Sequence, residues 1–348
     1  MTLEQELAAA NPAGRSAAVA VGTFDGVHLG HQKLLSVLKE EARRRGLVSV
    51  ALTFRQQPRS VVRPDVPFSY LCELYERLEL LRGLGLDALA VVDFAEPVRR
   101  LSAEQFLSLL QRTLGLKLLV LGPNARQGHD QMNAAGLRGL GARLGFDVVS
   151  AAAASAGGEQ VSSTSVRRAL AEGRVRDAAA LLGRPFSLTG PVLPGDRRGR
   201  ELGFPTANLG PFANATVPMD GIYATWAYLG GERHMAATSI GVRPTFGQGN
   251  ERRVEAYILD FERDLYGSRL RLEFVERLRG EAAYPGPGPL IEQIRKDVAQ
   301  TREVLGKSPR HPALSTSPLP AGEGEGEGEA FTVRRPPDPP LAGTPPSP

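Results

Sequence analysis

The stretch Val21–Leu35, VGTFDGVHLGHQKLL, joins an apolar run to a segment of helical periodicity through a glycine-rich turn. Two of the five histidines of the chain, His28 and His31, lie in this turn. Ligands of open parallel sheets bind beyond the carboxyl ends of the strands, where such a turn would lie. Its glycines would let the backbone approach a phosphate, and the N-terminus of the following helix favours negative charge. The stretch therefore predicts a phosphate-binding site at a strand-to-helix turn.

Outward from this turn, short apolar runs alternate with segments of helical periodicity up to about residue 150. The alternation predicts a doubly wound parallel sheet with helices on both faces. A loop is expected over 151–160, followed by a helix that begins in the run of hydroxyl residues at 162–165. The apolar runs, read as buried strands, are 17–22, 48–54, 88–94, 116–122 and 146–150.

A second pattern begins after Pro185, where strand-like runs follow one another without long helices between them. Such runs, separated by turns rich in Gly and Pro, predict an antiparallel sandwich or small barrel. A last helix is expected over 289–304. Beyond Lys307 the chain is rich in Pro, Gly and Ser and carries a GEGEGEGE run, which predicts a disordered tail. The runs are 186–193, 221–229, 233–241, 252–261 and 268–278. The predicted domains are therefore 15–183 and 184–307, with a tail over 308–348.

The composition excludes several classes of protein. Hydrophobic residues make up 42% and charged residues 23% of the 348, which is typical of globular chains. The net charge of +4 comes without a Lys/Arg block, so small anionic ligands are expected and nucleic acid is not. Cys72 is the only cysteine, which excludes a disulfide framework. The first residues do not resemble a secretory signal, and no apolar run is long enough to span a bilayer. A cytoplasmic protein without a membrane partner is predicted.

The two histidines suit phosphate chemistry at this turn. Two imidazoles that face one point can donate hydrogen bonds to phosphoryl oxygens whose charge grows in a transition state. Nucleotidyl transfer depends mainly on such positioning and charge stabilisation. A metal site is less favoured, because no third His or Cys lies nearby. The segment 161–167, VSSTSVR, adds four hydroxyls and Arg167 at the start of a helix and would complete a nucleotide site, although a simple helix cap would look the same.

A second candidate site lies in the C-terminal half, in the segment 203–208, GFPTAN. The glycines at 195, 199 and 203 would let backbone amides surround a phosphate chain. The Thr206 hydroxyl and the Asn208 carbonyl are oxygen ligands of the kind that Mg²⁺ prefers. A plain turn is the alternative interpretation. Glu255 lies in a strand-like run, where a carboxylate usually faces solvent.

Taken together, these motifs resemble the bacterial bifunctional riboflavin kinase/FMN adenylyltransferase (FAD synthetase) family over nearly all of residues 17–305. The resemblance implies an α/β plus β architecture: a Rossmann-like nucleotidyltransferase domain with a parallel sheet, then a small antiparallel six-stranded β-barrel with kinase activity and a C-terminal helix. The matching N-terminal segments are GTFDGVHLGHQKLL (22–35), DFAEPVRRLSAEQF (93–106) and VSSTSVRRALAEGRVRDAAALLGRPF (161–186). The C-terminal ones are GDRRGRELGFPTANL (195–209), GIYAT (221–225), SIGVRPTFG (239–247), VEAYILDFERDLYG (254–267) and LIEQIRKDV (290–298).

The resemblance also implies roles for single residues. In the N-terminal domain, His28 and His31 would stabilise the α-phosphate of ATP while the phosphate of FMN attacks it and pyrophosphate leaves. In the C-terminal domain, Glu255 would be the general base that takes the proton of the ribityl terminal hydroxyl of riboflavin. Further ATP-binding residues would be Gly22, Phe24, Asp25, Gly30, Ser163, Thr164 and Arg167 in the first domain and Gly195, Gly199, Gly203 and Pro205 in the second. Thr206 and Asn208 would hold Mg²⁺ with ATP, and Asn124 and Arg295 would contact flavin.

The chain departs from the family pattern at several positions. The loop 122–128, GPNARQG, stands where the family usually has G-x-D-F-x-F-G, so Asn124 replaces an aspartate and both aromatic rings are missing. Gln57 precedes Pro58 where His is usual, and Tyr257 stands in place of a His. We expect both activities, with weaker FMN binding. The alternatives are a monofunctional riboflavin kinase with a degenerate N-terminal domain, a flavin- or nucleotide-sensing protein without catalysis, and another H-x-G-H nucleotidyltransferase, such as a cytidylyltransferase, fused to an unrelated barrel.

Overall fold

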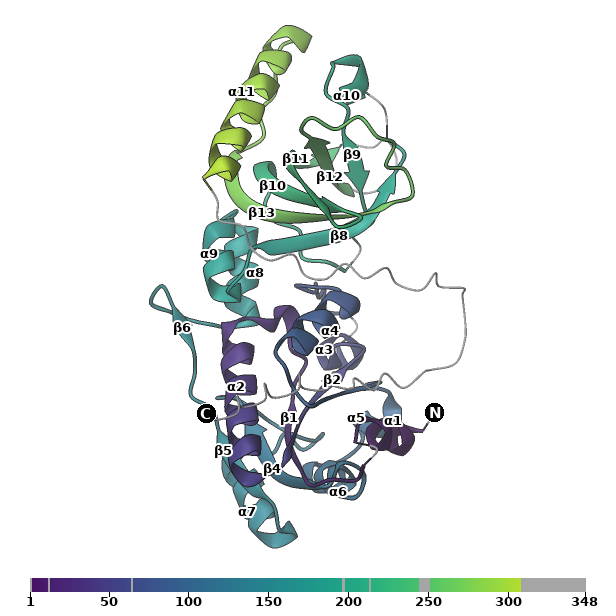
Figure 1. The fold of residues 1–348 in the computed structure, drawn as a ribbon, viewed down its shortest axis with the longest axis vertical. Helices are drawn as coiled ribbons and strands as arrows, with labels where there is room; N and C mark the ends of the chain where they lie inside the picture. Colours follow the sequence, from purple (N-terminus) through teal and green to yellow (C-terminus); the bar gives the residue numbers. More distant parts are fainter. Residues whose placement is uncertain are drawn as a thin grey trace, which may run out of the picture.

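The computed structural model describes residues 2–11, 13–63, 65–195, 198–212, 214–243 and 251–307. The described chain has two parts stacked along the longest axis, a parallel sheet with its helices and a barrel, with α8 and α9 between them (Figure 1). The predicted tail 308–348 lies outside the described residues.

The first part is built on a five-stranded parallel sheet in the order β3-β2-β1-β4-β5. β1 is central, so the turn that follows it opens in the middle of the carboxyl edge of the sheet. The predicted parallel sheet is confirmed, and its strands end within two residues of the predicted bounds. The strands are β1 (Ala17–Val21), β2 (Val48–Phe54), β3 (Ala88–Val92), β4 (Leu116–Leu121) and β5 (Asp147–Ser150).

Helices cover both faces of this sheet, as the alternation of the sequence predicts. Ala17 and Val19 of β1 belong to one core with α1 (Leu3–Ala10), α6 (Ala103–Leu114) and α7 (Ala134–Leu144). Ala18 and Ala20 belong to the opposite core with α2 (Leu29–Arg45) and α4 (Leu74–Gly83). Successive side chains of a strand point to opposite faces, so β1 is buried on both. Three short helices, η1 (Asp25–Val27), α3 (Pro58–Val62) and α5 (Glu96–Arg99), lie in the connections.

The segment 151–160 corrects one expectation. It is not only a loop, because it contains a two-stranded hairpin of β6 (Ser155–Ala156) and β7 (Glu159–Gln160). The turn residues between these strands, Gly157 and Gly158, both have positive φ, as a tight hairpin turn requires. α8 (Ser163–Ala171) and α9 (Val175–Leu182) follow, and the helix expected after the hydroxyl run is confirmed.

The second part is a closed antiparallel barrel in the order β10-β11-β12-β9-β8-β13, which confirms the six-stranded barrel. One strand, β9, is absent from the runs read as strands, because its three residues are too few to show alternation. The helix expected over 289–304 is confirmed as α11 (Pro287–Gly306) and packs on β10, β11 and β13. The strands are β8 (Phe186–Leu193), β9 (Ala207–Leu209), β10 (Gly221–Leu229), β11 (Glu232–Arg243), β12 (Glu251–Ile258) and β13 (Arg269–Arg279), and a short α10 (Arg198–Glu201) precedes β9.

The barrel core continues into α8 and α9. Val166, Leu170 and Leu182 of these helices share one apolar cluster with Phe186 and Phe274 of the barrel. The predicted domain limit after residue 183 therefore falls inside a continuous core, and the limits 15–183 and 184–307 stay predictions. No helix in the described part of the chain has the length and apolar character to cross a membrane.

Candidate active sites

The turn after β1 has a strained backbone. Phe24 and Val27 have φ of 49° and 40°, in the left-handed region, and Gly26 between them has φ of 76°. Such a conformation is unfavourable for Phe and most of all for a β-branched residue such as Val. Strain of this kind persists where surrounding contacts hold the chain in place, and it is common at functional sites.

His28 ends this turn and caps the next helix. Its Nδ1 accepts a hydrogen bond from the backbone N–H of His31 at 3.3 Å, as the N-cap of α2. An imidazole nitrogen that accepts carries no proton, so in the neutral ring the proton lies on Nε2. The cap therefore selects the tautomer in which Nε2 can donate to a ligand.

The two imidazoles stack on each other. Their ring centroids are 3.7 Å apart with an interplanar angle of 15°, and Phe24 meets His31 edge-on at 5.4 Å. Among the described residues, Nδ1 of His31 is buried without a hydrogen-bond partner. A Cβ at Gly22 would lie 3.0 Å from the Phe24 ring, and one at Gly30 would lie 3.0 Å from the His28 ring. Three further predicted site residues, Gly22, Phe24 and Gly30, therefore lie close to the imidazoles.

Both histidines are neutral at neutral pH in this structure. Burial, followed by the charges of Arg184 and Arg167, lowers the pKa of His28 to about 4. Burial, followed by the charges of His28 and Arg77, lowers the pKa of His31 well below its usual value. A proton on one ring disfavours a proton on the ring stacked against it, so both rings are uncharged and could serve as neutral donors.

These shifts predict a specific dependence of stability on pH. The unfolded chain protonates His28 near its ordinary pKa of 6.5, and the folded chain does so only near a pKa of about 4. Stability is therefore lost as the pH falls below 6.5, by about 2 kcal/mol from His28 alone between pH 7 and pH 5. In urea unfolding at both pH values, wild type should lose that much more than His28→Asn, which keeps a capping side chain. Equal losses in the two proteins would contradict the shifted pKa.

The buried Asp25, within the turn, forms an ion pair with the half-buried Arg167. The Asp25 carboxylate pairs with Arg167 and accepts a hydrogen bond from Leu71 N at 3.0 Å. Arg167 also donates to Ser69 O at 2.8 Å and lies over the ring of Phe68. Burial raises the pKa of Asp25, and the Arg167 charge opposes that rise. Asp25 thus orders the turn, and ATP binding by either residue stays a prediction.

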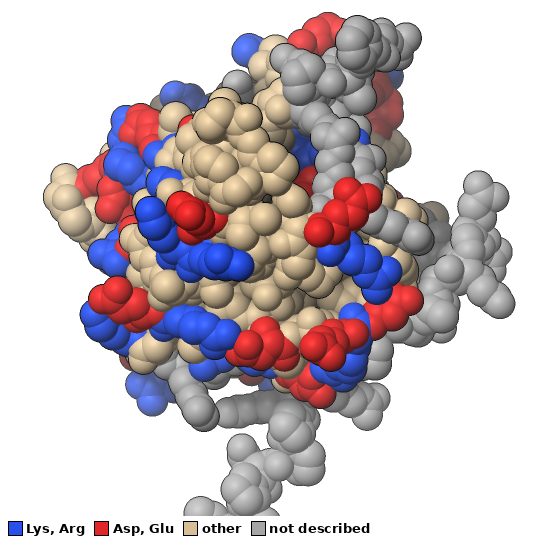
Figure 2. Space-filling model, turned by 90° about the horizontal axis from the view of Figure 1, so that it is seen from above, with Lys and Arg blue, Asp and Glu red and all other residues tan. Residues whose placement is uncertain are grey.

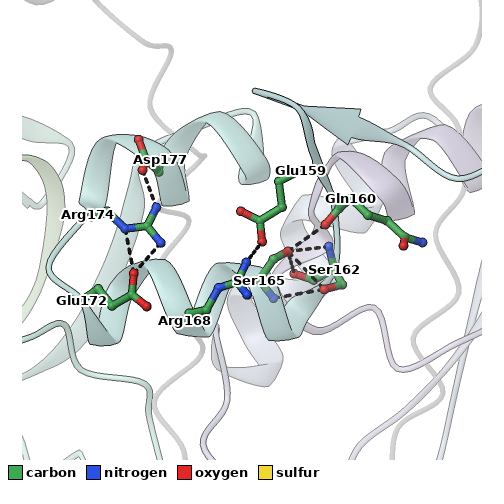
Figure 3. Close-up of polar contacts among 8 residues, drawn as sticks. All are labelled: Glu159, Gln160, Ser162, Ser165, Arg168, Glu172, Arg174 and Asp177. Atoms are coloured by element: carbon green, nitrogen blue, oxygen red, sulfur yellow. Dashed lines mark hydrogen bonds and ion pairs between the residues drawn. The ribbon is translucent and has the colours of Figure 1, made fainter.

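The N-terminus of α8 lies beside this pair. Ser162 caps α8 in a reciprocal arrangement with Ser165, so these two hydroxyls are used within the helix (Figure 3). The Ser163 hydroxyl donates to Asp25 O at 3.1 Å, and Thr164 is exposed. The structure therefore brings the two predicted phosphate-binding segments together. Figure 3 also shows Arg168 paired with Glu159, and Arg174 with Glu172 and Asp177, which tie α8 to the hairpin and to α9.

The kinase candidates meet across two barrel strands. Asn208 of β9 is paired in register with Glu255 of β12, and the Thr206 hydroxyl donates to the Glu255 carboxylate at 3.4 Å. Val254 and Ala256 are buried in the barrel core, so Glu255 lies on the outer face of the barrel. Glu255 is half-buried there with Thr206 beside it, and its role as the general base stays a prediction.

The glycine-rich segment before β9 packs closely on these residues. A Cβ at Gly195 would lie 2.1 Å from the Asn208 side chain, and one at Gly199 would lie 2.4 Å from Phe204 O. Gly203 has positive φ in the exposed turn that precedes Pro205. A side chain at 199 would collide with backbone, whereas one at 195 would have to displace the Asn208 side chain, so both glycines let the backbone lie close to Thr206 and Asn208.

The two predicted flavin contacts are not joined to either cluster. Asn124 is exposed in the turn after β4, and Arg295 is exposed on α11. The structure describes no hydrogen bond from either side chain to the His28 turn or to Glu255. Tyr257, in the family's His position, packs edge-on against Phe204 at 5.3 Å, a contact that the sequence did not indicate.

Sequence reasoning also missed two arginines that hold the His28 turn. Arg77 is almost fully buried and donates to Thr23 O at 2.9 Å and Phe54 O at 2.7 Å, at the carboxyl ends of β1 and β2. Arg184 donates to Gly26 O at 3.0 Å. Arg77 lies one turn before the buried Leu81 of α4, and this spacing is the one signal of its burial.

Comparisons with known proteins match both parts of the chain. A model of FAD synthetase matches residues 10–165, and a model of riboflavin kinase matches residues 182–305. A bifunctional riboflavin kinase/FMN adenylyltransferase of Listeria monocytogenes is 35% identical over 83% of this chain and 92% of its own. This chain belongs to that family. The Escherichia coli K12 member is 36% identical over 82% of this chain and 92% of its own.

The fold has a solved relative as well. A Streptococcus pneumoniae structure, described as a macrolide-efflux protein, matches with a TM-score of 0.76 and 31% identity over 82% of this chain and 94% of that one. Both family models match this chain, and the match to the Listeria relative covers nearly the whole length of that protein. These matches support the bifunctional interpretation over the monofunctional one.

Proposed function

We propose that this chain makes FAD from riboflavin in two ATP-dependent steps. The barrel domain phosphorylates riboflavin to FMN, and the parallel-sheet domain transfers AMP from ATP to FMN with release of pyrophosphate. The observation that carries this proposal is that one chain holds two separate clusters suited to phosphate, each within the residues matched by its own family model.

The adenylyl transfer follows from the stacked imidazoles. A phosphate oxygen of FMN attacks the α-phosphorus of ATP, and the bond to the pyrophosphate oxygen breaks. Negative charge grows on the α-phosphoryl oxygens, where the Nε2–H of His28 and the ring of His31 donate hydrogen bonds. The first turn of α8, with Ser163 and Thr164, supports the leaving pyrophosphate through its N–H groups. No covalent intermediate is required.

The phosphorylation of riboflavin follows from Glu255. Its carboxylate takes the proton of the ribityl terminal hydroxyl while that oxygen attacks the γ-phosphorus of ATP and ADP leaves. In the described residues Glu255 accepts only a long hydrogen bond from Thr206, at 3.4 Å, so a substrate hydroxyl can readily replace it.

Mg²⁺ fits the same cluster. The Thr206 hydroxyl, the Asn208 amide oxygen and the nearby Glu255 carboxylate are oxygen donors, and no group of three or more His, Cys, Asp or Glu side chains in the described residues could hold a metal by itself. Such a donor set suits an ion shared with nucleotide phosphates. Thr206 and Asn208 would hold Mg²⁺, which would neutralise phosphate charge there.

We infer that both reactions take place in the cytoplasm and that the partners of the enzyme are the small molecules ATP, riboflavin and FMN. On the face seen from the barrel end, Lys and Arg alternate with Asp and Glu around an uncharged surface (Figure 2). This interspersed charge supports small-molecule partners over nucleic acid.

A time course tests the whole proposal. The purified chain is incubated with riboflavin, ATP and Mg²⁺, and the three flavins are separated by chromatography. We expect FMN to appear first and FAD to follow, because the reacting-phosphate residues are intact although the aromatic rings of loop 122–128 are missing. FMN without FAD would leave the kinase and show that the first domain is degenerate. Neither product would refute both assignments.

A further inference from the structure

The turn that carries the two histidines is held from the barrel side. Arg184 lies between α9 and the first barrel strand and donates from Nη1 to Gly26 O at 3.0 Å. Gln32 of α2 donates to both Val27 O and Leu182 O, each at 2.9 Å. The backbone carbonyls of the strained residues Gly26 and Val27 are therefore bound to the end of α9 and the start of the barrel.

A second connection runs through the segment 69–72. Tyr70 N donates to Asn214 O and Thr216 N donates to Tyr70 O, both at 2.7 Å, so the loop before β10 forms a bridge with this segment. The next two residues bind the turn: Leu71 N donates to the Asp25 carboxylate, and Gly26 N donates to Cys72 Sγ at 3.3 Å.

The junction around these bonds is packed, and in it Nε of Arg184 is buried without a hydrogen-bond partner among the residues that the structure describes. Leu71 and Leu182 belong to the same apolar cluster as Phe186 of β8. Glu76 of α4 accepts a hydrogen bond from the Ser187 hydroxyl, also in β8. A packed interior transmits a change at one residue to its neighbours, because few voids absorb it.

Charged groups from four elements surround the stacked rings. Arg184 precedes β8, Arg167 lies on α8, Arg77 on α4, and the Asp25 carboxylate, in η1, is paired with Arg167. Arg184 is the one of these that belongs to the barrel half of the chain. Burial is the largest cause of the low pKa of His28, and the charges of Arg184 and Arg167 lower this pKa further.

We propose that Arg184 is a positioning residue for adenylyl transfer, supplied by the kinase half of the chain, which holds the Gly26 carbonyl and thereby keeps the His28 turn in its strained conformation. This inference rests on the proposed adenylyl transfer. It makes the barrel a structural part of the neighbouring active site.

Arg184→Gln in the full chain tests this role. We expect kcat for FAD formation from FMN to fall by up to about a hundredfold, since small displacements of catalytic groups cost that much. FMN formation from riboflavin should stay within twofold of wild type, about the reproducibility of such a rate. The acid limb of kcat/KM for FAD formation should move to higher pH, because His28 gains a proton more readily once the Arg184 charge is gone.

Two further variants separate positioning from folding. Arg184→Lys keeps the charge, so its acid limb should stay in place while its kcat is reduced less. Arg176→Gln is the matched control, because Arg176 lies on α9 at the same junction and pairs with Glu276. An Arg184→Gln enzyme with wild-type kcat, or one that loses both activities together, would overturn the proposal. So would an equal loss in Arg176→Gln.

The titration of His28 by NMR separates this inference from the proposed function. If the wild-type protein makes no FAD, the proposed adenylyl transfer fails. The role of Arg184 can then still be tested by the titration of the His28 ring signals, which are identified as the signals missing from His28→Asn. A higher pKa of His28 in Arg184→Gln, together with changed amide shifts at Gly26 and Val27, would support its hold on the turn. Unchanged signals would refute that hold.

Discussion

Glu255→Gln should abolish FMN formation, with a loss of about 10²–10⁴ in kcat, the usual contribution of a general base. The amide has nearly the shape of the carboxylate and can still accept the Thr206 hydrogen bond, which is long already at 3.4 Å. It cannot take the proton of the ribityl hydroxyl. ATP binding should be largely intact, because Thr206, Asn208 and the glycine segment are unchanged.

The control for Glu255→Gln lies within the same molecule. Conversion of added FMN to FAD should continue in the variant, because the His28 turn belongs to the other domain. Glu262→Gln, an exposed carboxylate in the turn after the same strand, should leave FMN formation unchanged. Near-normal turnover by Glu255→Gln would refute its assignment as the base.

The second large effect is expected at His28. His28→Asn should lower kcat for FAD formation by about 10²–10³, the cost of removing one preorganised donor from a developing oxyanion. Asn is a good N-cap, so α2 should keep its start and the loss should report the imidazole. The rate would be measured with saturating FMN and ATP, and FMN formation from riboflavin should be unchanged.

His31→Gln extends this test. The stacked rings act on the same phosphoryl group, so the double variant should lose less than the product of the two single losses. A rate for His28→Asn within tenfold of wild type would contradict the role of the stacked pair as the main source of charge stabilisation.

The surroundings of the two imidazoles explain why they suit ATP. Burial and nearby arginines keep both rings neutral in the free chain, although a phosphate beside them would favour their protonated forms. The two imidazoles are thus uncharged hydrogen-bond donors surrounded by positively charged arginine side chains. In the proposed reaction, the arginines would supply the charge that attracts the nucleotide, and the N-cap and the stacking would fix the direction in which the rings donate.

The local pattern of the sequence determined most of the architecture. Periods of two and of about 3.6 residues are set by the backbone itself, so they placed the five parallel strands, the barrel runs and α11 within a few residues. The His28 and Ser163 segments were also visible, because a strand-to-helix turn and a helix cap each depend on neighbours a few positions away.

Only the tertiary structure decided which side chains hold those segments. β9 exists because Asn208 pairs with Glu255 some forty-seven positions later, and no alternation in three residues could predict it. Arg167 pairs with Asp25 across 142 positions, and Arg184 reaches Gly26 across 158. An arginine that is buried against carbonyls looks, in the sequence, like any exposed arginine. Such contacts arise only when distant segments pack together, because the free energy of a buried hydrogen bond depends on partners that the local sequence does not contain.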